Sequence, residues 1–398
     1  WKSIENLTVG DYAYSKVEAQ YNDDKDYENA FWNSSEKILY LYDGASIGSS
    51  LWATTVERYT LPDLNVNDDV TVQGSSSGDT MNLNVVRAGS GSTETWYGGD
   101  WTLNMKGGND SLYSAKLKNG DSIDMGDGDD YVAMMITGTS GTPTIANLSL
   151  AKLDGGAGND TLSWGESTGV DGQELTLTTG GATNFENIYG TSASETIKGD
   201  DNANILKGGR GGTDTIYGYG GNDTLYGHGQ DSDNYNNSSY TDAKTLYGGA
   251  GNDTLYGGYG DDTLDGGTGT DTLTGGNGVD TFVLRSGDGS TTLADANAIK
   301  DFTDGTDVLG MDNGLTFDEL TIEQGTGDYA SHTLISITST GEYLAILENT
   351  TASDVTAIDF TNLSTDPQTF NGTSGDDTFI GGAGNDTFNG GAGSDTLL

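Results

Sequence analysis

Residues 248–283 read GGAGNDTLY, GGYGDDTLD, GGTGTDTLT and GGNGVDTFV, which is one nine-residue phrase repeated four times without a gap. Glycine fills the first, second and fourth positions, aspartate the sixth, threonine the seventh and a large apolar residue the eighth. Glycine lets the backbone adopt positive φ and brings carbonyl oxygens close together. Aspartate adds a hard oxygen ligand, which suits calcium better than softer metals. The phrase therefore predicts a parallel β-helix that binds calcium in its turns.

The phrase resembles the nonapeptide of the repeats-in-toxin (RTX) family, the hemolysin-type calcium-binding repeat. The resemblance implies a bacterial secreted or surface protein that uses type I secretion and carries several calcium ions as its cofactors. The expected fold class is all-β: a parallel β-roll or β-helix solenoid with calcium-bound glycine-rich turns. A β-rich N-terminal region and a β flanking segment are expected beside the roll.

The apolar residue of each phrase is expected to point inward, because side chains alternate between the two faces of a strand. These inward residues are Leu255, Leu264, Leu273 and Phe282. One phrase gives a strand on one side of the roll and the next phrase a strand on the other, so a full coil takes two phrases. One large apolar residue per phrase makes a thin core, and ordering a glycine-rich backbone is costly. Folding is therefore expected to depend on calcium.

Each calcium ion is expected between stacked turns, where aspartate carboxylates of neighbouring coils and backbone carbonyl oxygens can supply the ligands. Successive phrases should place Asp253 and Asp271 along one edge and Asp262 and Asp280 along the other. The glycines assigned to these turns are Gly248, Gly251, Gly257, Gly260, Gly266 and Gly269. The phrase restarts at Gly372, and that second roll should pair Asp377 with Asp395 and place Asp386 opposite.

Degenerate copies of the phrase come before the four-phrase block. Their candidate calcium ligands are Asp110, Asp130, Asp160, Asp214 and Asp223. Glu195 and Asn204 occupy the aspartate position in two further copies. Each keeps an oxygen but changes its reach or charge, so weak or absent ions are expected there. Residues 228–243 are expected to form a loop extruded from the roll.

The repeat pattern divides the chain into five parts. Residues 1–79 are a β-rich lead-in region, 80–182 an irregular β-helix with degenerate repeats, and 183–283 the RTX β-roll. Residues 284–366 are a β flanking or capping segment, and 367–398 start a second RTX β-roll. A cap is expected because an open roll end exposes strand edges and apolar side chains. The chain begins at Trp1 and ends within a repeat, so both ends are expected to be cuts in a longer polypeptide.

The charge of the chain limits its partners. The 61 acidic residues outnumber the 16 Lys and Arg, which gives a formal net charge of −45. Such a chain repels itself unless cations balance it, and nucleic acid and anionic membranes are poor partners for it. The hydrophobic fraction of 33% argues against disorder and favours bound cations. The chain has no Cys for disulfides, and no apolar run is long enough for membrane insertion.

No catalytic constellation is recognisable in the sequence, so the chain is not expected to be an enzyme. It has 2 histidines, His228 and His332, and both are expected to be structural. The zinc-protease phrase HExxH is absent. Residues 74–78, GSSSG, match a nucleophile elbow but lie in a Ser- and Gly-rich turn without a strand-turn-helix pattern. A carboxylate pair for glycoside hydrolysis remains an alternative in so acidic a chain.

The sequence therefore predicts a secreted calcium-binding structural protein at the bacterial cell surface or outside the cell. A surface-layer, sheath, filament or adhesin subunit would self-associate once calcium binds, with cell-surface polysaccharide as a further partner. One alternative is a polysaccharide-modifying exoenzyme that carries RTX modules. The other is a passive module for type I export and folding.

Overall fold

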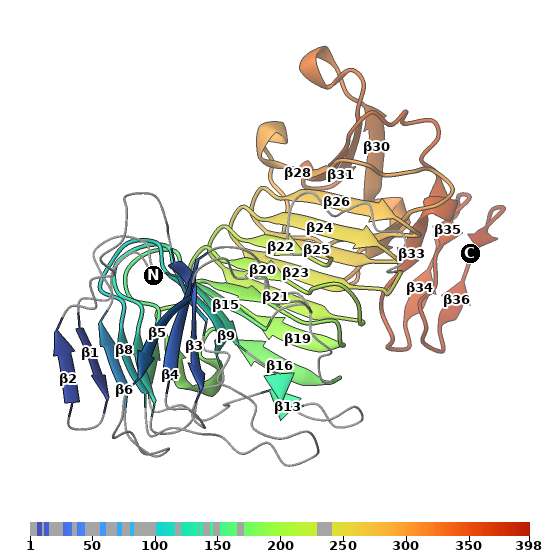
Figure 1. Ribbon diagram of the computed structural model, residues 1–398. Coiled ribbons are helices and arrows are strands. Elements are labelled where there is room, and N and C mark those ends of the chain that lie inside the picture. The colour runs from blue at the N-terminus through green and yellow to red at the C-terminus, as the bar shows by residue number, and fades with distance from the viewer. Residues whose placement is uncertain are drawn as a thin grey trace. The chain divides into compact units, whose positions relative to one another are not determined.

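The computed structural model describes residues 101–115, 121–134, 136–137, 144–145, 152–164, 171–228 and 241–398, and seven strands between residues 6 and 82 (Figure 1). The chain forms two compact units, residues 1–170 with 175–190 and residues 171–174 with 191–398. The described regular structure consists of strands and single-turn 3₁₀ helices. Among the described residues, no helix has the length and apolar character needed to cross a membrane.

The first unit combines antiparallel N-terminal strands with a parallel coil. Strand β1 (Asn6–Val9) pairs with β2 (Tyr12–Ser15), and β3 (Tyr27–Asn33), β4 (Ile38–Asp43) and β5 (Val56–Thr60) form an antiparallel sheet. One sheet of the coil contains, in spatial order, β6 (Val70–Gln73), β8 (Trp101–Asn104), β10 (Ser122–Asp124), β14 (Lys152–Asp154) and β17 (Ala182–Thr183). The other contains β7 (Thr80–Asn82), β9 (Ser111–Ala115), β11 (Tyr131–Met134), β15 (Thr161–Ser163) and β18 (Asn187–Tyr189).

Three shorter features complete this part of the chain. Strands β12 (Ile136–Thr137) and β13 (Thr144–Ile145) form a separate antiparallel pair. Strand β16 (Gln173–Thr176) and helix η1 (Thr179–Gly181) fall where the two units alternate along the sequence.

The second unit is a longer roll of the same kind. One sheet contains β19 (Glu195–Lys198), β21 (Thr215–Gly220), β23 (Thr245–Ala250), β25 (Thr263–Thr268), β27 (Thr281–Leu284), β29 (Val308–Met311) and β33 (Phe360–Asn362). The other contains β20 (Ile205–Lys207), β22 (Thr224–Tyr226), β24 (Thr254–Tyr259), β26 (Thr272–Asn277), β28 (Asn297–Ile299) and β32 (Glu342–Leu347). The chain alternates between the two sheets, so it winds as a coil of parallel strands.

The core of this roll is one column of apolar side chains from each sheet. Leu246, Leu264 and Phe282 are aligned in register on one sheet, and Leu255 and Leu273 on the other. All five are at most 1% exposed. The predicted inward position of the eighth residue is therefore confirmed, and so is the expectation of an all-β parallel roll.

The segment after β27 continues both sheets and then changes strand direction. Strand β32 lies parallel to β28, whereas β31 (Thr333–Ile337) and β30 (Leu320–Gln324) add antiparallel. The helices here are η2 (Leu293–Asp295), η3 (Phe317–Glu319), η4 (Gly327–Tyr329) and η5 (Ala357–Asp359). Ala296, Leu334 and Ile346 form a small buried cluster in this segment. It is β-rich, as the flanking segment was predicted to be.

The repeats that restart at Gly372 form two short parallel sheets. Strand β34 (Thr369–Asn371) pairs with β36 (Thr387–Asn389), and β35 (Thr378–Phe379) pairs with β37 (Thr396–Leu397). The rings of Phe370 and Phe388 stack with centroids 5.0 Å apart. This segment therefore repeats the parallel pairing of the main roll.

Candidate calcium sites

A ladder of aspartates runs along each edge of the roll in the second unit. The backbone N–H of Asp253 donates to Oδ1 of Asp271 at 2.9 Å. On the other edge, the N–H of Asp262 donates to Oδ1 of Asp280 at 3.0 Å. Each pair is separated by 18 residues. The period of the sequence thus places successive aspartates on alternate edges and joins neighbouring coils through each carboxylate.

The second carboxylate oxygen of these aspartates is buried with no hydrogen-bond partner. This holds for Oδ2 of Asp223, Asp253, Asp262 and Asp271. Each of these residues is 1% exposed. Burying an anionic oxygen is costly unless a donor or a cation compensates it. The edges of the roll therefore present rows of buried carboxylate oxygens that call for a cation.

The first glycine of each phrase leaves the space beside that oxygen open. A Cβ on Gly248 would lie 2.5 Å from Oδ2 of Asp253 and 2.6 Å from the carbonyl oxygen of Gly266. A Cβ on Gly257 would meet Oδ2 of Asp262 at 2.5 Å in the same way. Any side chain at this position would occupy the space between carboxylate and carbonyl oxygens. The glycine is therefore required by the candidate site as well as by the close approach of the next coil.

These residues fit calcium. Carboxylate and carbonyl oxygens are the ligands that calcium takes in proteins, in sets of six to eight. Among the described residues, no three His, Cys, Asp or Glu side chains converge as a metal site. Backbone carbonyls of the glycine-rich turns would therefore complete the ligand set around Asp253, Asp262, Asp271 and Asp280. When bound, calcium would neutralise the buried carboxylates and link one coil to the next.

Burial changes the protonation of the same carboxylates. Loss of hydration raises the pKa of Asp262 to about 8, against the backbone hydrogen bond from Lys244. The same effect raises the pKa of Asp271 and of Asp280 to about 7. A buried carboxylate with a raised pKa binds a proton when no metal balances its charge. Protons and calcium therefore compete for these oxygens.

We expect acidification to have opposite effects on the calcium-free and calcium-loaded chains. The folded roll without calcium holds protons up to about pH 7 or 8, whereas an unfolded aspartate releases them near its usual pKa of about 4. Without calcium, stability should therefore increase as the pH falls from 8 to 5. In calcium, the same change should weaken ion binding and lower stability. The β signal in circular dichroism between pH 8 and 5, with calcium or in metal-free buffer, tests both signs, and a parallel response in the two series would contradict the assignment.

The degenerate repeats of the first unit show the same arrangement. The N–H of Asp110 donates to Oδ1 of Asp130 at 2.7 Å, and the N–H of Asp130 to Oδ1 of Asp160 at 2.8 Å. Oδ2 of Asp130 and of Asp160 is buried without a hydrogen-bond partner. Desolvation raises the pKa of Asp130 to about 6 and that of Asp160 to about 7. These turns, which are 20 and 30 residues apart, keep the geometry although the sequence spacing is irregular.

The side-chain oxygens of Glu195 and Asn204 accept hydrogen bonds from residues four positions earlier in the chain. Glu195 Oε2 accepts from the N–H of Thr191 at 3.0 Å, and Oε1 accepts from the Thr191 hydroxyl. Asn204 Oδ1 accepts from the N–H of Asp200 at 2.8 Å. These bonds give a physical reason for the weak or absent ions predicted at both turns, which stays a prediction.

Two ligand-type residues beyond the repeats were missed in the sequence. Asn297 Oδ1 accepts from the N–H of Asp271 at 2.9 Å, and Asp307 Oδ1 accepts from the N–H of Asp280 at 3.1 Å. Both continue the ladders into the flanking segment. A signal was available, because each is followed two residues later by a buried apolar residue, Ile299 or Leu309. The signal was concealed because Asn297 lacks all three glycines of the phrase and Asp307 keeps only Gly305.

The second roll has shorter ladders. The N–H of Asp377 donates to Oδ1 of Asp395 at 3.2 Å, and Asp386 Oδ1 accepts from the N–H of Gln368 at 2.9 Å. The predicted pair is brought together, with Asp386 in the facing turn. Asp377 and Asp395 are more exposed than the aspartates of the main roll.

Both histidines contact backbone groups. His228 Nδ1 lies 3.3 Å from the carbonyl oxygen of Gly257, and burial lowers the pKa of His228 to about 4. His332 Nδ1 accepts from the N–H of Asn349 at 2.9 Å. Residues 74–78, and residues 229–240 of the predicted loop, lie outside the described residues.

The chain matches known proteins through its repeats. A family model for the RTX calcium-binding nonapeptide repeat (4 copies) matches residues 152–163, 189–212, 199–232, 247–282, 256–290 and 365–397. Among solved structures, the AlgE6R3 subunit of the Azotobacter vinelandii mannuronan C5-epimerase is 22% identical over 49% of this chain and 80% of its own, with a TM-score of 0.19. The extracellular lipase LipA from Serratia marcescens is 15% identical over 72% of this chain and 38% of its own, with a TM-score of 0.21. At these TM-scores neither likeness bears on function. No curated protein matches the chain.

The two-sheet coil and its aspartate ladders define a glycine–aspartate parallel β-roll. The matched segments show that the chain carries RTX calcium-binding repeats. RTX repeats bind calcium, which agrees with the open carboxylate oxygens along both edges.

Proposed function

We propose that this chain is a secreted structural protein, a subunit of a bacterial surface layer, sheath, filament or adhesin, that folds and self-associates when calcium binds. RTX repeat proteins are typically secreted. The observation that carries the proposal is the row of buried Oδ2 atoms along the roll. Their charge disfavours the coil until calcium neutralises it, so the chain would stay mobile where calcium is scarce and become rigid outside the cell.

The way the coils stack supports a scaffolding role. Each coil contacts only the coil before it and the coil after it. Calcium bound between coils would therefore stiffen the roll along its axis. Stacked tyrosines reinforce the outside of the rod, with ring centroids 4.8 Å apart for Tyr217 and Tyr247 and 5.0 Å apart for Tyr226 and Tyr256. Strand β30 is the last strand of its sheet, and such an edge can pair with a second copy of the chain.

Electron microscopy of the purified chain tests self-association. We expect fibres or sheets in millimolar calcium that dissolve when EGTA is added in excess. Magnesium at the same concentration is the control, because magnesium dehydrates reluctantly and should not replace calcium in these turns. Monodisperse particles in calcium, with full β structure by circular dichroism, would contradict the assembly proposal and favour a folding module for export. Depolymerisation of an added polysaccharide would support the exoenzyme instead.

A further inference from the structure

Lys244 stands where the repeat calls for aspartate. Residues 239–247 read SYTDAKTLY, which keeps the threonine and leucine of the phrase but lacks all its glycines and replaces its aspartate. The strand forms nevertheless. Strand β23 pairs in parallel register with β21 and β25, and Leu246 is fully buried. The coil therefore continues through a turn that has lost the usual calcium-type residues.

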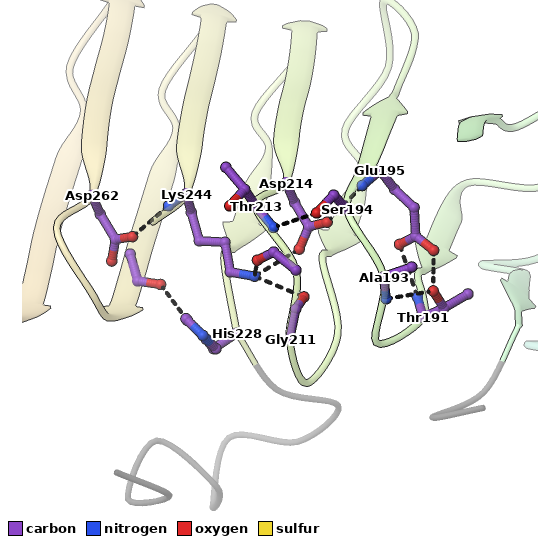
Figure 2. Close-up of polar contacts among 12 residues, drawn as sticks. Thr191, Ala193, Ser194, Glu195, Gly211, Thr213, Asp214, His228, Lys244 and Asp262 are labelled. Carbon is purple, nitrogen blue, oxygen red and sulfur yellow. Dashed lines mark hydrogen bonds and ion pairs between the residues drawn. The ribbon is translucent and has the colours of Figure 1, made fainter. Parts of the chain in front are cut away.

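The ammonium group of Lys244 lies among oxygens of the kind that calcium takes. Its Nζ donates to Oδ2 of Asp214 at 2.8 Å, to the carbonyl oxygen of Gly211 at 2.9 Å and to that of Gly212 (Figure 2). Both side chains of the ion pair are fully buried. The three donors of the ammonium thus meet one carboxylate and two carbonyl oxygens of a glycine-rich turn.

Asp214 consequently differs from four of the other predicted ligands in the same roll. Oδ2 of Asp223, Asp253, Asp262 and Asp271 has no hydrogen-bond partner, whereas Oδ2 of Asp214 has a lysine. The pair is neutral as a whole, and its hydrogen bonds offset the cost of burying the two charges. The backbone of Lys244 still donates to Oδ1 of Asp262 at 2.7 Å, so the ladder on this edge continues (Figure 2).

A second contact holds the same two strands together without metal. On the outer face, the rings of Tyr217 on β21 and Tyr247 on β23 stack with an interplanar angle of 5°. The strands align from Thr215 opposite Thr245 to Gly220 opposite Ala250. The junction between β21 and β23 is thus fastened on its inner side by an ion pair and on its outer side by stacked rings.

We propose that the Lys244 ammonium is a tethered cation that takes the place of calcium at the Gly211–Asp214 turn. Strands β21 and β23 then form a calcium-independent seed on which the calcium-dependent coils stack. The contrast with those coils rests on the calcium sites proposed above. The turn at Asp214 takes no calcium ion in the natural chain, because its cation is already part of the polypeptide.

Hydrogen exchange in calcium and in EGTA tests the seed in the natural chain. With EGTA, we expect residues 215–220 and 245–250 to keep their protection while residues 254–282 lose theirs. Protection of 254–282 in EGTA would contradict the proposed calcium function. Loss of protection at 215–220 and 245–250 to the same extent as at 254–282 would overturn the seed. The two failures are read from different peptides.

Substitution of Lys244 tests the tethered cation. In EGTA, Lys244→Met should speed exchange at 215–220 and 245–250 by at least about 100-fold, because breaking a buried ion pair costs about 3–5 kcal/mol. Lys198→Met is the matched control, because Lys198 lies on β19 of the same sheet and its pair with Glu174 is exposed. That control should change exchange by less than about twofold. Equal exchange in Lys244→Met and the natural chain would overturn the proposal.

A second variant, Lys244→Asp, tests the tethered cation even if Lys244→Met does not fold. It places a second carboxylate beside Asp214 and the two glycine carbonyls. We expect elemental analysis in saturating calcium to find one more bound calcium per chain than in the natural protein, and protection of 245–250 to become calcium-dependent. Unchanged calcium content together with unchanged protection in EGTA would show that the ammonium does not occupy a cation position.

Discussion

In excess EGTA at neutral pH, the roll over residues 254–282 should lose its β structure and recover it when calcium is restored. Its buried Oδ2 atoms would then have no counter-charge, and its core holds one large apolar side chain per phrase. Each site kept at 100 times its Kd stabilises the fold by about 2.7 kcal/mol. Neighbouring sites are joined by hydrogen bonds between coils, such as that from Asp253 to Asp271. The β structure should therefore return over a narrower range of calcium concentration than a single independent site would give. Circular dichroism measures the loss and hydrogen exchange locates it.

A substitution at one candidate calcium site separates the effect of calcium binding from the general effect of lowering the negative charge. Asp262→Asn keeps an Oδ1 acceptor for the backbone of Lys244 but removes the buried charge. We expect the calcium concentration at half-folding to rise by at least about tenfold, because ligand charge sets calcium affinity. Asp261→Asn is the control: Asp261 is exposed, and its Oδ1 accepts from the N–H of Val279. Its effect should stay within about twofold. A β signal unchanged in EGTA, in a protein shown to hold no calcium, would refute the calcium requirement.

The repeats made the geometry of the main roll predictable from sequence. Where the phrase is complete, its period alone places Asp253 and Asp271 on one edge and Asp262 on the other, with Leu264 inside. Strand alternation and the tight glycine turn leave no other register that buries the apolar residue. The same reasoning reached Asp130 and Asp160 in the first unit, although loops of different length separate them.

The hydrogen bonds of the aspartate ladder explain why Lys244 and Asn297 were not recognised from the sequence. Each rung needs an oxygen acceptor on one coil but only a backbone N–H on the coil before it. The donor position is thus open to any residue except proline, and Lys244 fills it without breaking the ladder. The acceptor can be an amide, as in Asn297. A sequence search for glycine and aspartate finds the turns of calcium-binding type. It overlooks a turn that keeps the hydrogen bond between coils but has another residue in place of aspartate.

A second large effect is expected from substitution of the glycine at the fourth position of the phrase. Gly251→Ala should lower the free energy of unfolding by about 3–5 kcal/mol, from the summed costs of overpacking two stacked turns and straining the backbone. Gly251 has φ of +136°, which L side chains rarely adopt, and its Cβ would lie 1.6 Å from the carbonyl oxygen of Gly221. That oxygen cannot retreat cheaply, because it belongs to the turn of the preceding coil. The next coil is stacked equally closely, with a Cβ on Gly269 only 1.7 Å from the carbonyl oxygen of Gly251.

Gly341→Ala separates backbone strain from the stacking of turns. Gly341 also has positive φ, +72°, but a Cβ there would meet nothing within 4 Å. Its substitution should cost only the strain of a left-handed residue, about 1–2 kcal/mol. Urea unfolding of both variants in saturating calcium gives the two costs. The Gly251 variant should in addition need more calcium to fold, since its alanine separates the coils whose oxygens the ion would join. If the two substitutions cost the same and leave the calcium midpoint unchanged, the turns are not packed closely enough for ions to be held between them.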